Sequence, residues 1–254
     1  MQATANTENI TIILSKPKYS GNVGSIARCA KNMCIDKIAV VNSQALVEAE
    51  MLQMATHCAA DVVSGLKHYH EIQEALAGYQ YIVGTTSRLG SARGPAVSPR
   101  EIADEIVDIS RNNKVALLFG CEDKGLSNEE LRYCHRVVSI PTSDSFKSVN
   151  LSHAVMIICY EIFTARTGSL SAFTPQMATS SEIEGMYSHL KSILTKIGFL
   201  NPENPEYWMM HIRRFLARTK LYAKDVKIIR GICRQIDWYI ANTLSEYDNP
   251  VINN

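Results

Sequence analysis

The stretch VALLFGCEDKGLS, residues 115–127, decides the fold of the first part of the chain. Its apolar run, Val115–Phe119, lacks polar alternation, which is typical of a strand in a parallel sheet covered on both faces. Gly120 and Gly125 in the following turn allow a close backbone approach or a positive φ. Ser127 and Glu130 have the spacing of a capping box, which predicts the start of a helix. The stretch therefore predicts a strand, a tight turn and a helix, the repeating unit of α/β proteins.

Similar units lie on both sides of this stretch. Four further apolar runs predict strands, at Thr11–Leu14, Lys37–Val41, Tyr81–Gly84 and Val137–Ile140. Helices are predicted over the apolar stripe Val23–Met33, from Pro99 to Ile109, and over the mostly apolar Leu151–Thr167. This alternation predicts an α/β fold with a parallel sheet that binds its ligands at the carboxyl ends of the strands.

The last third of the chain has a different character. Gly168–Ala178 carries no charge and no periodicity, and it is predicted to link two domains. Beyond it, Ser181 and Glu184 have the spacing of another capping box, and further helical patterns cover Glu206–Arg218 and Lys224–Leu244. We therefore expect an α/β domain over residues 1–167, a linker over 168–178 and a small all-α extension over 179–254.

The charge of the chain is balanced overall but uneven along the sequence. Its 254 residues contain 26 Lys and Arg against 25 Asp and Glu, so bulk charge indicates neither a nucleic acid nor a membrane as partner. Residues 209–234, in contrast, hold eight basic residues against Asp225 alone. Such a stripe either binds the phosphates of a nucleic acid or is an ordinary solvated helix face. The residues expected to make such contacts are Arg213, Arg214, Arg218, Lys220 and Arg230.

Several other classes of site and location are disfavoured. The seven cysteines form no CxxC pair, so we expect free thiols in a reducing cytoplasm. His68 and His70 are the remaining metal candidate, but on a polar segment they are interpreted as surface residues, so no metal is expected. The longest apolar run, Ala154–Tyr160, is far shorter than the roughly 20 residues that span a membrane. The first residues also lack the basic start and apolar core of a secretory signal.

Three of the strand ends carry residues suited to chemistry. After the first strand, the turn Gly21–Ser25 can present free N–H groups to an anion, and Arg28 follows one turn later, where an ordinary exposed arginine could equally stand. Glu122 directly follows the strand 115–119, where its carboxylate can orient a basic or hydroxyl group. Ser148 and Asn150 precede the helix that starts at Leu151, and they can cap it.

In their order and spacing these residues resemble the SPOUT-class 2′-O-ribose methyltransferases of the SpoU/TrmH type. The family's first motif, Asn-x-Gly-x-x-x-Arg, is present as Asn22–Arg28, and its second, Phe-Gly-x-Glu-x-x-Gly-Leu, as Phe119–Leu126. The third is present as Ile140-Pro141 followed by Ser148-Val149-Asn150, with Val149 in place of leucine. Cys34 replaces the glycine that usually ends the first motif, which implies only that the backbone there need not be left-handed. The tail resembles the C-terminal extension of the TrmJ subgroup, which methylates transfer RNA.

The resemblance implies a SPOUT fold whose C-terminal portion is threaded into a trefoil knot, and a homodimer. S-adenosylmethionine is expected against the knot loops, at Thr85, Thr86, Ser87, Gly120, Ile140, Ser148, Val149 and Asn150. Arg28 is the expected catalytic arginine, and the residues expected to orient it and the ribose are Asn22, Glu122, Ser148 and Asn150. Because a guanidinium hardly loses its proton in proteins, Arg28 is expected to hold the adjacent phosphate and polarise the hydroxyl group.

The resemblance of the tail favours methylation of tRNA at nucleotide 32 of the anticodon loop, on cytidine or uridine. Two alternatives stay open: the same chemistry on rRNA or another tRNA position, and a non-catalytic RNA-binding module. The second is disfavoured because all five motif residues are present, namely Asn22, Arg28, Glu122, Ser148 and Asn150. A dinucleotide-binding oxidoreductase is disfavoured because no GxGxxG motif follows the first strand.

Overall fold

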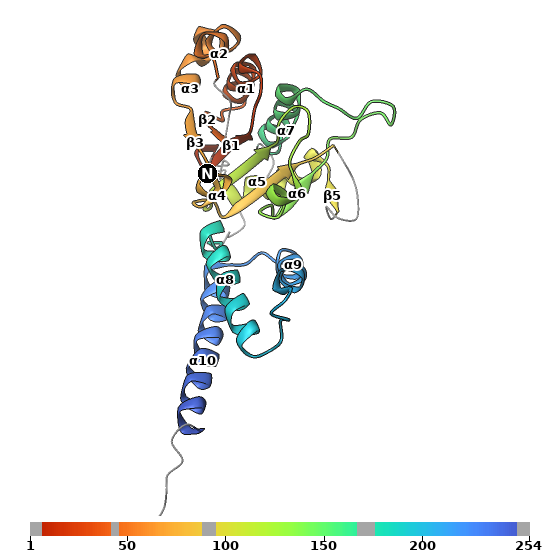
Figure 1. Cartoon of the computed structure of the whole chain (residues 1–254). Helices are drawn as coiled ribbons and strands as arrows, with labels where there is room; N and C mark the ends of the chain where they lie inside the picture. Colours follow the sequence, from red (N-terminus) through yellow and green to blue (C-terminus); the bar gives the residue numbers. More distant parts are fainter. Residues whose placement is uncertain (1–6, 42–45, 88–94, 167–175, 248–254) are drawn as a thin grey trace, which may run out of the picture. The chain divides into compact units, whose positions relative to one another are not determined.

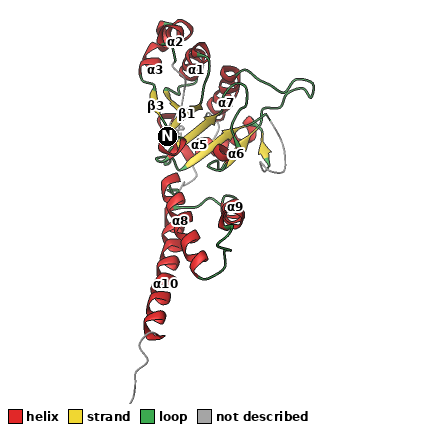
Figure 2. Cartoon of the chain, viewed as in Figure 1, coloured by secondary structure: helices red, strands yellow, loops and turns green. Residues whose placement is uncertain are grey.

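The computed structural model describes residues 7–41, 46–87, 95–166 and 176–247. The chain forms two compact units, residues 1–176 and residues 177–254, and each is treated by itself below. The first unit combines a sheet with helices, whereas the described secondary structure of the second is helical (Figure 1 and Figure 2). Within the described ranges, no helix is long and apolar enough to cross a membrane.

The first unit is built on a parallel seven-stranded sheet with the strand order β3-β2-β1-β6-β4-β7-β5. Its strands are β1 Ile10–Ser15, β2 Lys37–Val41, β3 Lys67–Tyr69, β4 Tyr81–Thr85, β5 Ala96–Val97, β6 Val115–Phe119 and β7 Arg136–Val138. The predicted parallel α/β sheet is thus confirmed. The sequence pattern missed β3 and β5 because strands of three and two residues are too short to show a period.

The register of the central strands aligns their carboxyl ends. Leu14 of β1 pairs with Phe119 of β6, and Leu118 of β6 pairs with Gly84 of β4. The next residue of β4, Thr85, pairs with Val138 of β7. Because these strands are parallel, the segments that follow β1, β4, β6 and β7 all leave from one edge of the sheet, where α/β proteins bind their ligands.

Helices cover both faces of the sheet. On one face, α4 (Ile72–Leu76) and α6 (Asn128–Leu131) share an apolar cluster with strand residues that include Ile13 and Leu118. On the other, the alternating residues Ile12 and Leu117 are equally buried. The helices that pack together there are α1 (Ser20–Asn32), α5 (Pro99–Ser110) and α7 (Leu151–Ala165). The shorter elements are η1 (Thr7–Asn9), α2 (Glu48–Ala55), η2 (His57–Ala59) and α3 (Ala60–Ser64).

The end of α1 corrects one expectation from the sequence. The backbone at Cys34 is left-handed, with φ of 58°, so the inference that it need not be is wrong. The Cys34 N–H donates to the Lys31 carbonyl and the Ile35 N–H donates to the Ala30 carbonyl, which is the Schellman pattern of a helix end. This pattern requires a left-handed residue, and glycine adopts that conformation without steric cost. Cys34 therefore carries backbone strain that a glycine would avoid.

The second unit contains α8 (Ser180–Lys196), α9 (Pro205–Leu216) and α10 (Ala223–Tyr247) (Figure 2). Its apolar core is formed by Ala178, Met186, Tyr187, Leu200, Met209, Leu221 and Val226. Helix α8 begins with a capping box of Thr179 and Glu182. The predicted box of Ser181 and Glu184 is therefore wrong by two residues, because both pairs have the same spacing in the sequence.

The predicted linker 168–178 lies mostly outside the described residues. Its last two residues, Met177 and Ala178, are buried, and Met177 pairs with Tyr222 in an isolated β-bridge of the second unit. The packed helical unit therefore begins before the predicted boundary at residue 179. The division into domains at 167 and 179 otherwise stays a prediction.

Candidate active site

Three polar side chains, from the segments that follow β1, β6 and β7, are joined by hydrogen bonds. Asn22 lies in the first turn of α1, Glu122 follows β6, and Asn150 is the N-cap residue of α7. Asn22 Nδ2 donates to Glu122 Oε1 at 2.9 Å, and Asn150 Nδ2 donates to Asn22 Oδ1 at 3.2 Å. This hydrogen-bonded series, called here the Glu122–Asn22–Asn150 chain, joins one residue from each of the three motifs.

Asn150 has a second role as the cap of α7. Its Oδ1 accepts a hydrogen bond from the Ser152 N–H at 2.9 Å and another from the Ser152 hydroxyl group at 2.7 Å. The first of these satisfies a backbone donor of the first helical turn. One amide group therefore starts the helix and also holds Asn22. Ser148 is exposed and makes no hydrogen bond with the residues that the structure describes, so the expected cap comes from Asn150.

Both carboxylate oxygens of Glu122 accept hydrogen bonds. Oε1 faces Asn22, and Oε2 accepts the backbone N–H of Lys18 at 3.0 Å. The Lys18 amine pairs with Asp123, and this hydrogen bond raises the pKa of Lys18 above its usual range. The turn after β6 is therefore fixed to the loop after β1 by two contacts of Lys18 and to the start of α1 by Asn22. Sequence reasoning missed Lys18, because nothing in the motif KPK indicates that its backbone N–H serves a distant carboxylate.

The turn after β6 owes its shape to two glycines. A Cβ atom on Gly120 would lie 2.0 Å from the carbonyl carbon of Gly125, so no other residue fits there without moving the backbone. Gly125 has φ of 62°, and its N–H donates to the Cys121 carbonyl at 2.8 Å. The close approach and the positive φ expected from the sequence are both confirmed. The tight turn then positions Glu122 beside α1.

Arg28 lies away from this cluster in the single chain. It follows Asn22 by six residues on α1, so its side chain leaves the helix about 120° around the axis from Asn22. It is exposed, and no residue in the described ranges gives it a hydrogen bond or an ion pair. The structure thus brings together Asn22, Glu122 and Asn150, but it does not join Arg28 or Ser148 to them.

The residues expected to bind a cofactor lie along the ends of β4, β6 and β7. Thr85 Oγ1 donates to the Leu118 carbonyl at 3.3 Å, and the Thr86 N–H donates to the Val138 carbonyl at 2.9 Å. These two threonines therefore connect β4 to both neighbouring strands. Among the others, Ile140 and Val149 are half-buried, while Ser87 and Ser148 are exposed.

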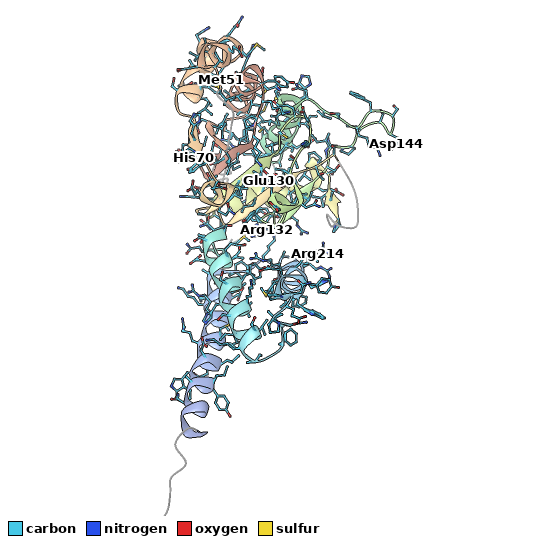
Figure 3. All side chains as sticks on the ribbon, in the orientation of Figure 1. Met51, His70, Glu130, Arg132, Asp144 and Arg214 are labelled. Carbon is cyan, nitrogen blue, oxygen red and sulfur yellow. The ribbon has the colours of Figure 1, made fainter. Side chains whose placement is uncertain are left out.

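The loop from residue 139 to residue 150 offers main-chain groups to a ligand. The Ser139 N–H donates to the Val97 carbonyl, and the Phe146 N–H donates to the Ser143 carbonyl. The other N–H groups between residues 140 and 149 have no hydrogen bond to any described part of the chain. Asp144 marks the part of this loop that extends away from the helices (Figure 3). Free peptide groups next to small side chains suit the hydrogen-bonding edges of a nucleoside.

The metal candidate from the sequence receives no support. His68 lies exposed on the edge strand β3. Across the described ranges, no group of three or more His, Cys, Asp and Glu side chains could hold a metal ion.

The basic residues of the second unit are of two kinds. Arg213 donates to both oxygens of Glu184 at 2.7 and 2.8 Å, and its guanidinium lies 4.3 Å from the centre of the Tyr187 ring. Arg213 therefore ties α9 to α8, and its contact with RNA stays a prediction. Arg214 and Arg218 are exposed, and neither forms an ion pair within the described part of the chain. The other two predicted RNA contacts, Lys220 and Arg230, are also exposed.

Comparisons with known proteins account for both units. The model of the SpoU rRNA Methylase family matches residues 9–160, which include all three motifs. The chain belongs to the SpoU methylase family. A second model, the C-terminal domain of the tRNA methyltransferase TrmJ, matches residues 181–247 and so covers the helical unit of this SpoU-family chain.

Similar proteins extend over nearly the whole chain. The tRNA (cytidine/uridine-2′-O-)-methyltransferase TrmJ of Pectobacterium atrosepticum is 33% identical over 234 residues, which cover 90% of this chain and 97% of the relative. The tRNA (cytidine/uridine/adenosine-2′-O-)-methyltransferase TrmJ of Pseudomonas aeruginosa is 32% identical over 238 residues, covering 89% and 92%.

Solved structures share the architecture. TrmJ from Z. mobilis superimposes with a TM-score of 0.77 at 24% identity, covering 89% of this chain and 98% of that chain, which shows a common fold. A methylase family protein from Neisseria gonorrhoeae superimposes with a TM-score of 0.66 at 32% identity, covering 71% of this chain and 93% of that chain.

Proposed function

We propose that this SpoU-family chain transfers a methyl group from S-adenosylmethionine to a ribose 2′-hydroxyl group of tRNA. The observation that carries the proposal is the Glu122–Asn22–Asn150 chain, which holds polar residues of all three motifs at the carboxyl edge of the sheet. The names of the Pectobacterium and Pseudomonas relatives support tRNA as the substrate.

The residues at the strand ends fit S-adenosylmethionine by their chemistry. We assign its binding to Thr85–Ser87, Gly120, Ile140 and Ser148–Asn150, where small side chains and free peptide groups face a common edge. When bound, S-adenosylmethionine supplies a methyl group already activated by a positively charged sulfur. The protein must then align the hydroxyl group with that methyl group and allow one proton to leave.

Arg28 is assigned to the RNA backbone beside the target ribose. Its guanidinium stays charged at neutral pH and presents several N–H donors, which suits a phosphate and a developing alkoxide. No described residue competes for it, because it is exposed and has no ion pair in the structure. Glu122, Asn22 and Asn150 are assigned to orienting the ribose, with Ser148 at the same loop.

A homodimer would complete this site. Because Arg28 and the Glu122–Asn22–Asn150 chain lie on different sides of α1 in one copy, we expect the RNA site to combine residues of two copies. The knot region, which includes the loop from residue 139 to residue 150, is the expected interface. Each copy would then contribute the exposed basic residues of its helical unit as phosphate contacts. Such local contacts can hold RNA although the net charge of the chain is only +1.

The trefoil knot itself is part of the proposal. Two features of the sheet support it: β6 lies between β1 and β4, and β7 lies between β4 and β5. Chain that follows β4 and β5 therefore returns to positions between strands formed earlier in the sequence.

The target nucleotide is inferred from the tail. The match of residues 181–247 to the TrmJ C-terminal domain supports a tRNA substrate, and we infer nucleotide 32 of the anticodon loop, carrying cytidine or uridine. Another tRNA position or rRNA is the alternative.

The test is methyl transfer from labelled S-adenosylmethionine to unmodified total tRNA, followed by nuclease mapping of the labelled nucleotide. A 2′-O-methylated nucleotide at position 32 is expected. Label at another ribose would overturn the choice of nucleotide and keep the reaction. An absence of label from both tRNA and rRNA, with S-adenosylmethionine still bound, would refute the proposed activity. An Asn22→Ala variant, which breaks the hydrogen-bonded chain at its centre, is expected to bind the cofactor and lose most turnover.

A further inference from the structure

Helix α9 has a buried face and an exposed face. Met209 is buried in the core of the helical unit, and Ile212 and Leu216 pack against the same core. The opposite face presents aromatic and basic residues at helical spacing, which are Tyr207, Trp208, His211, Arg214, Phe215 and Arg218. The apolar aromatic side chains on this face therefore have no role in the core of the unit.

Four of the rings near the start of α9 form one cluster. Phe199, in the turn after α8, lies with its centroid 6.4 Å from that of Trp208, and Tyr207 and His211 lie 5.9 and 6.2 Å from Trp208. We call these four residues the ring cluster. The interplanar angles to Trp208 are between 58° and 84°, so the rings are tilted or perpendicular to Trp208 and none is stacked parallel to it. Trp208 remains 48% exposed.

Positive charge adjoins the ring cluster without a matching acid. Arg214 follows His211 by three residues and Arg218 by seven, so both lie on the same side of the helix axis or just beyond its end. Both are exposed, and neither is paired with a residue in the described ranges (Arg214 is labelled in Figure 3). The acid on this helix, Glu206, already pairs with Lys191 of α8.

We propose that this face of α9 binds unpaired bases of the RNA substrate by stacking them on the ring cluster, with Arg214 and Arg218 on the adjoining phosphates. Exposed aromatic rings next to arginines that no described residue pairs are the combination that binds single-stranded nucleic acid, since every base has a π face and every linkage a negative charge. Bases inside a duplex cannot reach the rings. The face therefore selects an RNA loop over a stem, which rests on and deepens the proposed tRNA substrate.

A second copy of the chain is a poorer occupant of this face. A two-fold dimer places the same patch on both sides of the interface. Arg214 and Arg218 would then approach the partner's identical arginines, and Glu206 is already engaged by Lys191. An RNA loop instead supplies the negative charge that the face lacks.

The first experiment uses tryptophan emission of the full-length protein. The chain has two tryptophans, so Trp238→Phe leaves Trp208 as the sole reporter. A short single-stranded oligouridylate is expected to quench Trp208 emission, and a duplex RNA of the same length is expected to quench it far less. Equal quenching by both RNAs, or none by either, would overturn the stacking surface. A Trp208 emission that changes with protein concentration in the absence of RNA would also overturn it, because such a change indicates that two copies of the chain contact each other through this face.

The second experiment compares variants for affinity towards unmodified tRNA. Trp208→Ala is expected to weaken binding about 5- to 150-fold, the range for loss of one stacked base, and Trp208→Phe to restore most of it. Met210→Ala is the matched control, because Met210 is 40% exposed on the same helix but outside the ring cluster. The Trp208→Ala effect is expected in KM, with kcat nearly unchanged. Equal affinities of the Trp208→Ala and Met210→Ala proteins would refute the inference.

The two experiments separate this inference from the proposed function. Quenching by oligouridylate needs no methyl transfer, so it decides the stacking surface even if the wild-type protein methylates no RNA. Conversely, if the Trp208→Ala protein still methylates tRNA with an unchanged KM, the proposed function stands and the stacking surface is excluded.

Discussion

Replacing Arg213 by alanine is expected to destabilise the helical unit. The Arg213 guanidinium donates to both oxygens of Glu184 at 2.7 and 2.8 Å and lies over the Tyr187 ring at 4.3 Å. The side chains of Arg213 and Glu184 are 25% and 33% exposed, so water only partly replaces the lost contacts. The substitution leaves a half-buried carboxylate without its partner and uncovers one face of Tyr187.

The size of the effect follows from these contacts. Hydrogen bonds to charged groups contribute about 1.5–3 kcal/mol, and a cation over an aromatic ring adds about 0.5–1 kcal/mol. Partial exposure of both partners screens the ion pair and reduces the total. We therefore expect the free energy of unfolding of the helical unit to fall by about 2–3 kcal/mol in Arg213→Ala.

Urea unfolding followed by tryptophan emission measures this loss, because both tryptophans, Trp208 and Trp238, lie in the second unit. Arg214→Ala is the matched control: the neighbouring arginine is exposed and unpaired among the described residues, so its loss should weaken RNA binding and leave the midpoint unchanged. A double-mutant cycle with Glu184→Ala should give a coupling energy of about 1–2 kcal/mol. Equal urea midpoints for the two single arginine variants would refute the structural role of Arg213.

Four further outcomes are expected. Arg28→Ala should lower turnover about 100-fold or more with unchanged affinity for S-adenosylmethionine by calorimetry; a fully active variant would remove Arg28 from the reaction. In Glu122→Gln the new amide group would face either the Asn22 amide or the Lys18 N–H with a donor, so one of these hydrogen bonds is lost. Turnover should therefore fall about 10-fold while the circular dichroism spectrum is unchanged. Wild-type kinetics would contradict the positioning role of Glu122. Cys34→Gly relieves a left-handed φ of 58° and should raise the Tm by about 2 °C, where a lower Tm would count against strain at this helix end. Burial lowers the pKa of His135 to about 4, below its unfolded value, so its neutral form stabilises the fold above about pH 6.5. That stability is lost as the pH falls towards 4, by up to about 3 kcal/mol. Acid unfolding curves should show a smaller loss in His135→Asn, and identical curves would exclude His135 as the source.

The strand ends could be predicted from the sequence because their signal is local. Long apolar runs such as Val115–Phe119 indicate buried parallel strands, and the structure buries every residue of this strand. Polar residues in the segments that follow such runs are then expected near one edge of the sheet. The meeting of Asn22, Glu122 and Asn150 agrees with that expectation, whereas their catalytic roles stay predictions.

The features that sequence reasoning missed depend on partners far away along the chain. Arg213 has the same local setting as Arg214, and its engagement follows only from Glu184, which lies on another helix 29 residues earlier. Lys18 is similar, since the acceptor of its N–H is 104 residues away. Cys34 is a different case. The absence of glycine there was interpreted as the absence of a left-handed backbone, but the Schellman hydrogen bonds impose that conformation whatever side chain is present.

The double use of Asn150 has a consequence for biosynthesis. A ribosome adds residues in order, so Asn22 and Glu122 emerge before the amide that completes their hydrogen-bonded series. The same amide caps α7, and the helix cannot form until its own residues have followed. Nascent chains that stop before Ile140 therefore carry two of the three motifs without the amide that completes the hydrogen-bonded series. Such fragments lack the contact that joins the third motif to the first, so the polar centre is completed only after α7 has been synthesised.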